Sequence, residues 1–204
     1  MSRFLYLLLV GLVAAERLVE LRVSRRNEER LRTRGARETG AGHYPFMVGL
    51  HGALLVAAPL EVWLLDREFH PLVGPAMLLV LAATMALRYW VVATLGVRWT
   101  TRVMVLPGAP RIRRGPYRWA RHPNYLAVGL EVVALPLVHS AWITALLFGL
   151  ANGCLLAVRI RVEERALGRG TGDAVRDGDS GTHPLPEPAR KIGDVSTPDS
   201  GNHG

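Results

Sequence analysis

The chain has 204 residues, half of them hydrophobic, and a formal net charge of +8. Its apolar residues are gathered in runs too long for the core of a soluble domain, so we assign the excess positive charge to contact with a membrane surface and not with nucleic acid. The single cysteine, Cys154, excludes an intramolecular disulfide, has no metal-ligand spacing around it, and is expected to be a small buried residue.

The first predicted element is a membrane-spanning helix over residues 4–21. This segment also resembles a cleavable signal peptide, but the further apolar runs behind it favour a retained helix. Near its end stand Glu16, Arg17 and Glu20. We interpret them as solvated at the membrane interface, and the alternative is that the two acids line a polar site. Residues 22–37 carry seven arginines and predict a basic amphipathic extension and loop.

Four further spans follow in the hydropathy pattern. Residues 46–65 and 72–92 are the second and third, joined by a short, nearly neutral turn. A basic loop over residues 96–122 comes next, and its length marks it as functional. The apolar segments 123–138 and 141–158 are separated by a tight break and predict a helical hairpin.

The end of the chain changes character at residue 168, where Gly, Asp, Ser, Pro and Thr predominate. We therefore expect a membrane domain over residues 1–167 and a disordered tail over residues 168–204. Nearly all the arginines before the tail fall in the first loop, the third loop and the segment after the last span, and such regions face the cytoplasm. The prediction is an all-α, polytopic membrane helix bundle with about five transmembrane helices.

The segment 111–125 concentrates arginines, aromatic residues and a Gly-Pro turn ahead of the fourth span. Pro123 suits the first turn of a helix. Arg121 and His122 then stand at the helix N-terminus, where backbone N–H groups favour anionic ligand groups. One interpretation is a basic membrane anchor. The other is a site where a charged, soluble cofactor meets a lipid-borne substrate.

Acidic residues supply the complementary charges. Glu131 lies inside an apolar segment, so it must face protein or a cavity, either as a structural ion pair or as a functional group. Its candidate partners are Arg88, Arg121 and Arg159. Glu163 and Glu164 point about 100° apart on one helix, so one can face a site while the other pairs locally.

These groups match the chemistry of S-adenosylmethionine. A carboxylate stabilises its sulfonium, arginines hold its carboxylate by paired hydrogen bonds, and aromatic rings contact its cation and its flat base. The aromatic candidates are Tyr117, Trp119 and Tyr125.

The sequence resembles the isoprenylcysteine carboxyl methyltransferase family of integral-membrane enzymes. The resemblance rests on the block Gly115-Pro116-Tyr117-Arg118-Trp119-Ala120-Arg121-His122-Pro123-Asn124-Tyr125, the hairpin after it, and Arg161-Val162-Glu163-Glu164, and it covers about residues 75–167. It implies that the C-terminal hairpin forms a cytoplasmic site for S-adenosylmethionine, while a lipophilic substrate enters from the bilayer. The residues assigned to cofactor binding are Gly115, Pro116, Tyr117, Arg121, His122, Pro123, Tyr125, Glu163 and Glu164. Arg161 completes the pocket and is a candidate catalytic residue.

There are two departures from the family pattern, of which the first bears on the substrate pocket and the second on how the cofactor is covered. Ala127 stands where the family commonly has glycine, and the aromatic-rich segment after the paired glutamates is missing. The chain looks most like a bacterial branch that is associated with type III polyketide synthases and methylates long-chain alkylresorcinols or alkylpyrones. This resemblance implies that the protein lies in a bacterial plasma membrane. Such a ring hydroxyl needs a proton acceptor, for which Glu131 and His122 are the candidates. We expect Glu131→Gln to slow methylation and leave cofactor affinity nearly unchanged.

Three other functions remain open from the sequence. The first is carboxyl methylation of the isoprenylcysteine type. The second is an NADPH-dependent, sterol-type membrane reductase, because some of these enzymes share the His-Pro-Asn-Tyr motif. The third is a non-catalytic membrane protein whose arginines bind anionic lipid.

Overall fold

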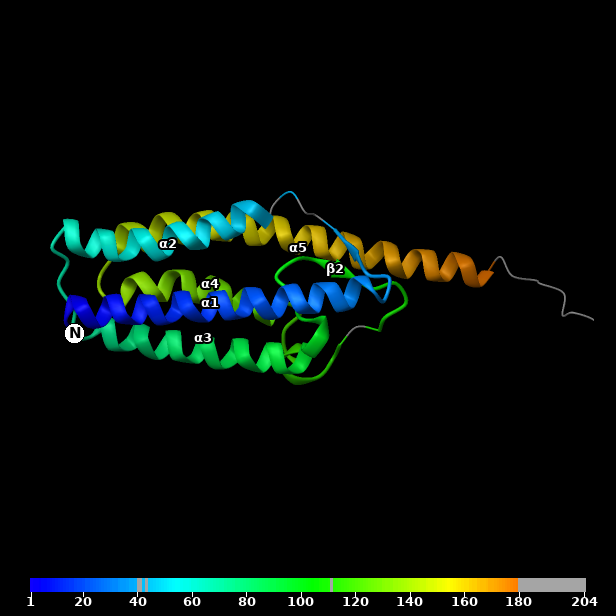
Figure 1. Cartoon of the computed structure of the whole chain (residues 1–204), viewed down its shortest axis with the longest axis horizontal. Coiled ribbons are helices and arrows are strands. Elements are labelled where there is room, and N and C mark those ends of the chain that lie inside the picture. Colours follow the sequence, from blue (N-terminus) through cyan, green and yellow to red (C-terminus); the bar gives the residue numbers. More distant parts are fainter. Residues whose placement is uncertain (40–41, 43, 111, 180–204) are drawn as a thin grey trace, which may run out of the picture.

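Five α-helices run side by side in the computed structural model, which describes residues 1–39, 42, 44–110 and 112–179 (Figure 1). Their bounds are α1 (Arg3–Arg32), α2 (Tyr44–Leu64), α3 (Val73–Leu95), α4 (Pro123–Leu137) and α5 (Trp142–Asp179). The predicted all-α fold class is confirmed, and each helix overlaps one of the predicted apolar segments, although α1 and α5 continue well beyond theirs.

Three of these segments are long and apolar enough to cross a membrane: Tyr44–Leu64, Val73–Arg98 and Trp142–Arg165. Helix α4 is apolar but shorter. Helix α1 carries charged residues in its middle, but its large, outward-facing apolar side chains extend from Phe4 to Val23. Twenty residues of helix rise about 30 Å, which equals the hydrocarbon thickness of a bilayer. The chain is an integral membrane protein.

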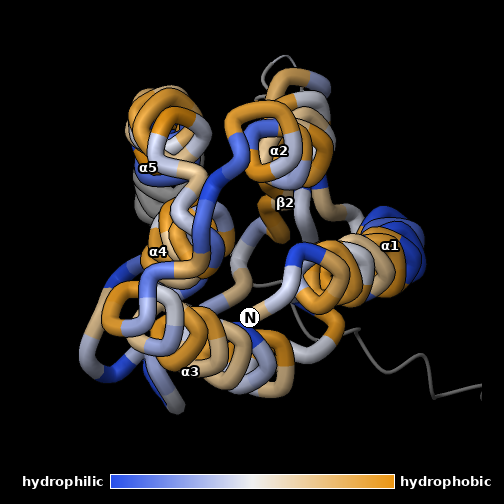
Figure 2. Tube along the Cα trace, turned by 90° about the vertical axis from the view of Figure 1, so that its left-hand side faces the viewer, coloured by the Kyte–Doolittle hydropathy of each residue, from blue (hydrophilic) through white to orange (hydrophobic). Residues whose placement is uncertain are grey.

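Helix α4 occupies a central position, packed against α3 on one side and α5 on the other, while α2 packs against α5 (Figure 2). Buried apolar side chains from all five helices or their ends form the core between them, among them Tyr6, Val62, Leu81, Leu135 and Ala141. The Tyr6 hydroxyl donates a hydrogen bond of 3.2 Å to the carbonyl oxygen of Leu135 near the end of α4, where that carbonyl would otherwise be unsatisfied.

The two ends of the bundle differ in composition. The N-terminus, the α2–α3 turn and the α4–α5 turn lie together at one end (Figure 1), where Arg3 contacts Asp66 at 2.7 Å. The arginine-rich segments lie at the other end. There, β1 (Arg37–Glu38) pairs antiparallel with β2 (Met104–Val105), flanked by the short helices η2 (Gly96–Arg98) and η3 (Gly115–Arg118).

Two expectations need correction. Helix α5 continues to Asp179, so residues 168–179 are helical and do not belong to the predicted tail. Residues 180–204, the rest of that tail, lie outside the described residues. Cys154 is exposed on α5 and not buried, because its position on the helix faces away from the bundle.

Candidate functional site

The turn before α4 is shaped by a glycine. Gly115 has φ +57°, and a Cβ at this position would overlap the Oγ1 of Thr94 on α3. Only glycine combines the left-handed conformation with so close an approach. The following Pro116 is buried in the first turn of η3. Gly115 and Pro116 therefore shape the backbone, and Tyr117 next to them is the residue that lines a cavity.

Helix α4 begins at Pro123, with His122 at its N-cap, as predicted. The backbone N–H of Tyr125 donates to the His122 carbonyl over 3.1 Å, which closes the first turn. This turn brings the rings of His122 and Tyr125 together in a stacked arrangement, with centroids 5.5 Å apart and planes inclined by 19°.

Helix α5 supplies the acids that meet this pair. The Tyr125 hydroxyl donates a hydrogen bond of 2.5 Å to Glu163 Oε2. The His122 ring lies between the two glutamates, with Nδ1 4.0 Å from Glu163 Oε2 and Nε2 3.5 Å from Glu164 Oε1. The structure therefore brings the Arg-His-Pro-Asn-Tyr turn and the paired glutamates into contact.

Arg159, which the sequence suggested only as a partner for an acid, completes this cluster. Its side chain is buried, with 6 % of the residue exposed. Its guanidinium lies 5.3 Å from the centroid of the Tyr125 ring, donates to the Thr101 carbonyl over 2.7 Å and contacts the sulfur of Met47. Arg159 and Glu163 share a helix face because they are four residues apart.

Arg161 does not take the predicted place beside the paired acids. It is exposed, and it is not among the described residues that line the cavities discussed below. Two residues of helix correspond to a rotation of about 200°, so Arg161 points away when Arg159 and Glu163 point inward. The i,i+4 spacing of Arg159 and Glu163 places them on one helix face, but the sequence alone does not tell that this face points inward.

A cavity of about 770 Å³ opens beside this cluster. Its lining includes the aromatic, imidazole and acidic side chains of Tyr117, His122, Glu163 and Glu164. It also includes the arginines Arg98, Arg113, Arg118 and Arg121 and the apolar residues Leu31, Leu95, Met104, Val105, Leu106 and Ile112. Burial raises the pKa of the Tyr117 phenol, and the nearby Glu163 carboxylate raises it further. Tyr117 is therefore neutral and can donate a hydrogen bond.

A smaller cavity of about 120 Å³ continues inward from the first. It shares Tyr117, Arg121, His122 and Glu163 with the larger one and adds Tyr125, Asn124 and Arg159. The Oδ1 of Asn124 and the Nε of Arg159 are buried without a hydrogen-bond partner among the described residues. Unpaired buried polar atoms are costly, so this cavity has capacity for a polar ligand group.

Two aromatic residues of the predicted cluster separate. Tyr125 faces the cavity, whereas Trp119 is 73 % exposed and packs edge to face on Trp90 of α3, with ring centroids 5.4 Å apart. Trp119 is therefore not available to a ligand in the cavity, and the pair has the position of an aromatic belt at a membrane interface.

Glu131 lies elsewhere. It is buried on α4, where Arg88 Nη1 of α3 is 3.3 Å from its Oε2 and Arg17 Nε of α1 is 3.6 Å from its Oε1. The same Arg88 holds Glu20 with two hydrogen bonds of 2.6 and 2.8 Å. Of the three predicted partners of Glu131, Arg88 is correct, while Arg121 and Arg159 belong to the cavity.

This ion cluster changes two interpretations. Glu20 is buried and paired, so the expectation that the charges of α1 are solvated at the interface is wrong for it. Glu131 is nine residues along α4 from His122, about 13 Å of helix, and it is not among the described residues that line the two cavities beside His122. Its position supports the structural role and not the catalytic one.

An apolar groove of about 730 Å³ runs between α2 and α5 on the outer surface. It is lined by Pro45, Phe46, Gly49, Leu50, Ala53, Phe148, Ala151 and Leu155. Its inner end lies close to the cavities, because Met47, next to Phe46, contacts Arg159, one turn after Leu155. A lipid chain in the groove would therefore end near Tyr125.

Comparison with known proteins places these elements in a family. Residues 76–169 match the model of the isoprenylcysteine carboxyl methyltransferase (ICMT) family. This range includes η3, α4 and the part of α5 that carries Glu163 and Glu164. The uncharacterised protein YpbQ of Bacillus subtilis (strain 168) is 36 % identical over 164 residues, which are 80 % of this chain and 96 % of YpbQ. An uncharacterised protein of Haemophilus influenzae (strain ATCC 51907 / DSM 11121 / KW20 / Rd) is 30 % identical over 156 residues, 76 % of this chain and 90 % of that protein. No solved structure matches the chain. On the family match and the extended similarity to these relatives, the chain belongs to the isoprenylcysteine carboxyl methyltransferase family.

Proposed function

We propose that this protein is an S-adenosylmethionine-dependent O-methyltransferase that acts at the membrane on the ring hydroxyl of a long-chain alkylresorcinol or alkylpyrone. Membership of the family indicates a membrane methyltransferase. The single observation that supports the cofactor most directly is the cavity whose lining combines Glu163 and Glu164 with Tyr117, His122 and a group of arginines.

The donors around this cavity fit S-adenosylmethionine. Glu163 and Glu164 would balance its sulfonium charge, and Arg121 or a neighbouring arginine would hold its carboxylate by paired hydrogen bonds. The volume of about 770 Å³ lies within the range of small-molecule sites, roughly 300–1,000 Å³. When bound, this cofactor supplies an electrophilic methyl group carried on sulfur.

The apolar groove between α2 and α5 supports a lipophilic acceptor. It offers an alkyl chain a hydrocarbon surface that is open to the bilayer and leads toward Arg159 and Tyr125. The head of the acceptor would then approach the smaller cavity, where Asn124 and Arg159 have polar atoms unpaired among the described residues. Holding the two reactants in such near-attack geometry contributes about 7–11 kcal/mol in favourable cases.

A hydroxyl acceptor must lose its proton as its oxygen is methylated. His122 is the proposed proton acceptor, because it lines both cavities and its ring nitrogens make no close hydrogen bond with any described residue. Glu131 is not proposed for this role, since Arg88 and Arg17 hold its carboxylate away from the cavities. Carboxyl methylation would need no such acceptor.

The orientation in the membrane is part of the proposal. The arginine-rich end of the bundle carries the cavity, and the excess of arginine in these loops favours the cytoplasmic side. A cytoplasmic cavity has access to a soluble cofactor. A type III polyketide synthase on the same side of the membrane would supply the acceptor.

Methyl transfer in membranes that contain the full chain tests this proposal. Radiolabelled S-adenosylmethionine is offered with a long-chain alkylresorcinol, with a farnesylcysteine carboxylate, and with neither. Label in the alkylresorcinol ether is the expected result, and label only in a base-labile ester would establish carboxyl methylation instead. NADPH consumption without methyl transfer would identify a reductase.

The non-catalytic alternative makes a different prediction for cofactor binding. Calorimetric titration of the purified protein with S-adenosylmethionine is expected to saturate at one site. A protein that only binds anionic lipid through its arginines would give no saturable heat, and its lipid binding would disappear as salt is raised.

A further inference from the structure

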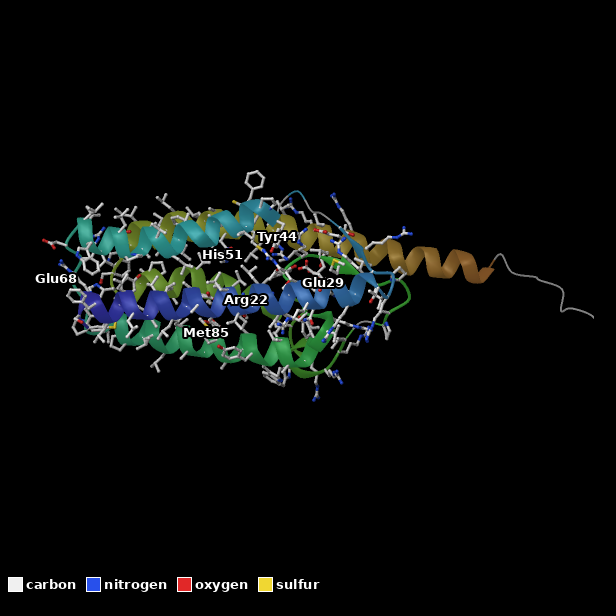
Figure 3. All side chains as sticks on the ribbon, in the orientation of Figure 1. Arg22, Glu29, Tyr44, His51, Glu68 and Met85 are labelled. Atoms are coloured by element: carbon white, nitrogen blue, oxygen red, sulfur yellow. The ribbon has the colours of Figure 1, made fainter. Side chains whose placement is uncertain are left out.

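The C-terminal part of α1 presents two opposite faces. Ser24, Asn27 and Leu31 are buried toward the bundle. Arg22, Arg25, Arg26 and Arg30 are exposed, and because three of them recur every fourth residue, with Arg25 beside them, they form one stripe on the side away from the bundle. Arg22 and Glu29 mark this part of α1 in Figure 3.

The stripe begins where the lipid-facing surface of α1 ends. The exposed large apolar side chains of this helix begin at Phe4 and continue as far as Val23, a distance of about 30 Å along the helix axis. Arg22 and Arg26 therefore stand at the boundary between hydrocarbon and headgroups. The helix has 30 residues, or about 45 Å, so its last turns project into the aqueous layer beyond that boundary.

Charge on this face is unbalanced. The outward residues from position 22 to position 30 include four arginines and one acid, Glu29. Among the described residues, Arg22, Arg25, Arg26 and Arg30 have no carboxylate within ion-pair distance, in contrast to Arg32, which pairs with Glu38 at 2.7 Å. Four exposed guanidinium groups at the headgroup level complement phosphate.

We propose that this arginine stripe (Arg22, Arg25, Arg26 and Arg30) binds the headgroups of anionic phospholipids in the membrane leaflet on the cavity side. Guanidinium groups bind phosphate oxygens by paired hydrogen bonds. Each arginine near an anionic membrane surface strengthens binding by about fivefold, so the loss of three arginines should weaken it by well over tenfold.

The buried face of the same helical turns contacts the segment 98–102, in which Arg98, Thr100 and Arg102 line the cavities. Asn27 Nδ2 donates to the Trp99 carbonyl over 2.8 Å, and the Thr101 N–H donates to Ser24 Oγ over 2.9 Å. Thr101 in turn accepts the hydrogen bond from Arg159. Lipid bound to the stripe would thus stabilise the position of the C-terminal part of α1, which makes these contacts beside the cavities. The link to activity rests on the proposed function, whereas lipid binding itself does not.

Retention of phosphatidylglycerol by the full chain is the test. The protein is purified from bilayers of phosphatidylcholine mixed with phosphatidylglycerol, and bound lipid is counted by native mass spectrometry. The variant with Arg22→Gln, Arg26→Gln and Arg30→Gln is expected to retain at least tenfold less phosphatidylglycerol at equal lipid concentration. The matched control removes the same charge from exposed arginines outside the stripe: Arg34→Gln, Arg37→Gln and Arg165→Gln.

The outcomes separate clearly. Retention that falls in the stripe variant but not in the control supports the proposal, and equal retention in both variants overturns it. Displacement of the lipid by inorganic phosphate as effectively as by phosphatidylglycerol vesicles would also overturn it, because the site would then be one for free phosphate. If the stripe variant does not fold, the salt dependence of lipid retention by the unmodified protein is the deciding measurement. Lipid retention that is lost at high salt supports the proposal, and retention that is unchanged at high salt overturns it. No methyl transfer is needed, so failure here is distinct from failure of the proposed function.

Discussion

Tyr125 of α4 donates its hydroxyl hydrogen to the carboxylate of Glu163 on α5 over 2.5 Å. This bond joins the turn that carries His122 to the helix that carries both acids, at the place where the two cavities meet. It also fixes which oxygen of Glu163 remains free to face a ligand. The geometry of the proposed cofactor site therefore depends on this contact between two helices.

The first prediction concerns the energetic coupling of these two residues. Tyr125→Phe removes the donor, and a hydrogen bond to a charged group contributes about 1.5–3 kcal/mol, so we expect S-adenosylmethionine affinity to fall about tenfold or more. Glu163→Gln should weaken affinity further, because it also removes the charge opposite the sulfonium. Calorimetric titration of both variants and of the double variant gives the coupling. If the losses of affinity in the two single variants simply add in the double variant, the bond does not position Glu163. The control is Tyr89→Phe on the exposed face of α3.

Arg159 and Arg161 are predicted to differ sharply. Arg159→Ala removes a buried guanidinium that lies over Tyr125 and holds Thr101, so we expect methyl transfer to fall at least tenfold. Arg161→Ala changes an exposed side chain and should leave activity within about twofold. Surface substitutions usually change the free energy of unfolding by under about 0.5 kcal/mol, so the variant should also remain folded. Initial rates in membranes with matched protein content measure both. A greater loss of methyl transfer in the Arg161 variant than in the Arg159 variant would contradict this prediction and would assign Arg161 to the site.

The buried ion cluster predicts an order of stability. Arg88→Met removes the guanidinium that contacts both Glu20 and Glu131 and leaves Arg17 as the one described arginine beside these two buried acids. Breaking a buried ion pair costs about 3–5 kcal/mol, and Arg17 should keep the loss near the lower end of that range. Glu131→Gln leaves Arg88 paired with Glu20 through two hydrogen bonds, so the expected loss is only about 1 kcal/mol. Thermal unfolding in detergent should therefore give a much lower Tm for the arginine variant. The reverse order would mean that Glu131, and not Arg88, holds the cluster together.

A glycine-to-alanine pair isolates the tight turn before α4. Gly115 and Gly108 both have positive φ, but a Cβ meets Thr94 at Gly115 and open space at Gly108. Backbone strain affects both variants, by about 1–3 kcal/mol, while the steric overlap adds about 1–3 kcal/mol to Gly115→Ala alone. The apparent Tm and the cofactor affinity should fall more in that variant. Thr94→Ala in the same chain is expected to restore part of the loss, and no restoration would refute the steric cause.

Local patterns in the sequence determined most of the helices and the start of the candidate site. Apolar runs of bilayer length predict α2, α3 and α5 because a buried backbone in lipid must form its hydrogen bonds within the segment. Pro123 predicts the first residue of α4, since its ring suits the first turn. The proximity of His122 and Tyr125 follows from that turn, and the paired acids were recognisable as complementary charges.

Only the tertiary structure decided which charged groups meet. Arg88 binds Glu20 and Glu131 because α1, α3 and α4 pack with these faces together, and no spacing within one helix specifies a partner on another. The choice of Arg159 over Arg161, the outward position of Trp119 and the pairing of β1 with β2 arise in the same way. Hydropathy determines that a helix crosses the membrane, whereas its rotation and its neighbours depend on packing among all five helices, and the site is built from those contacts.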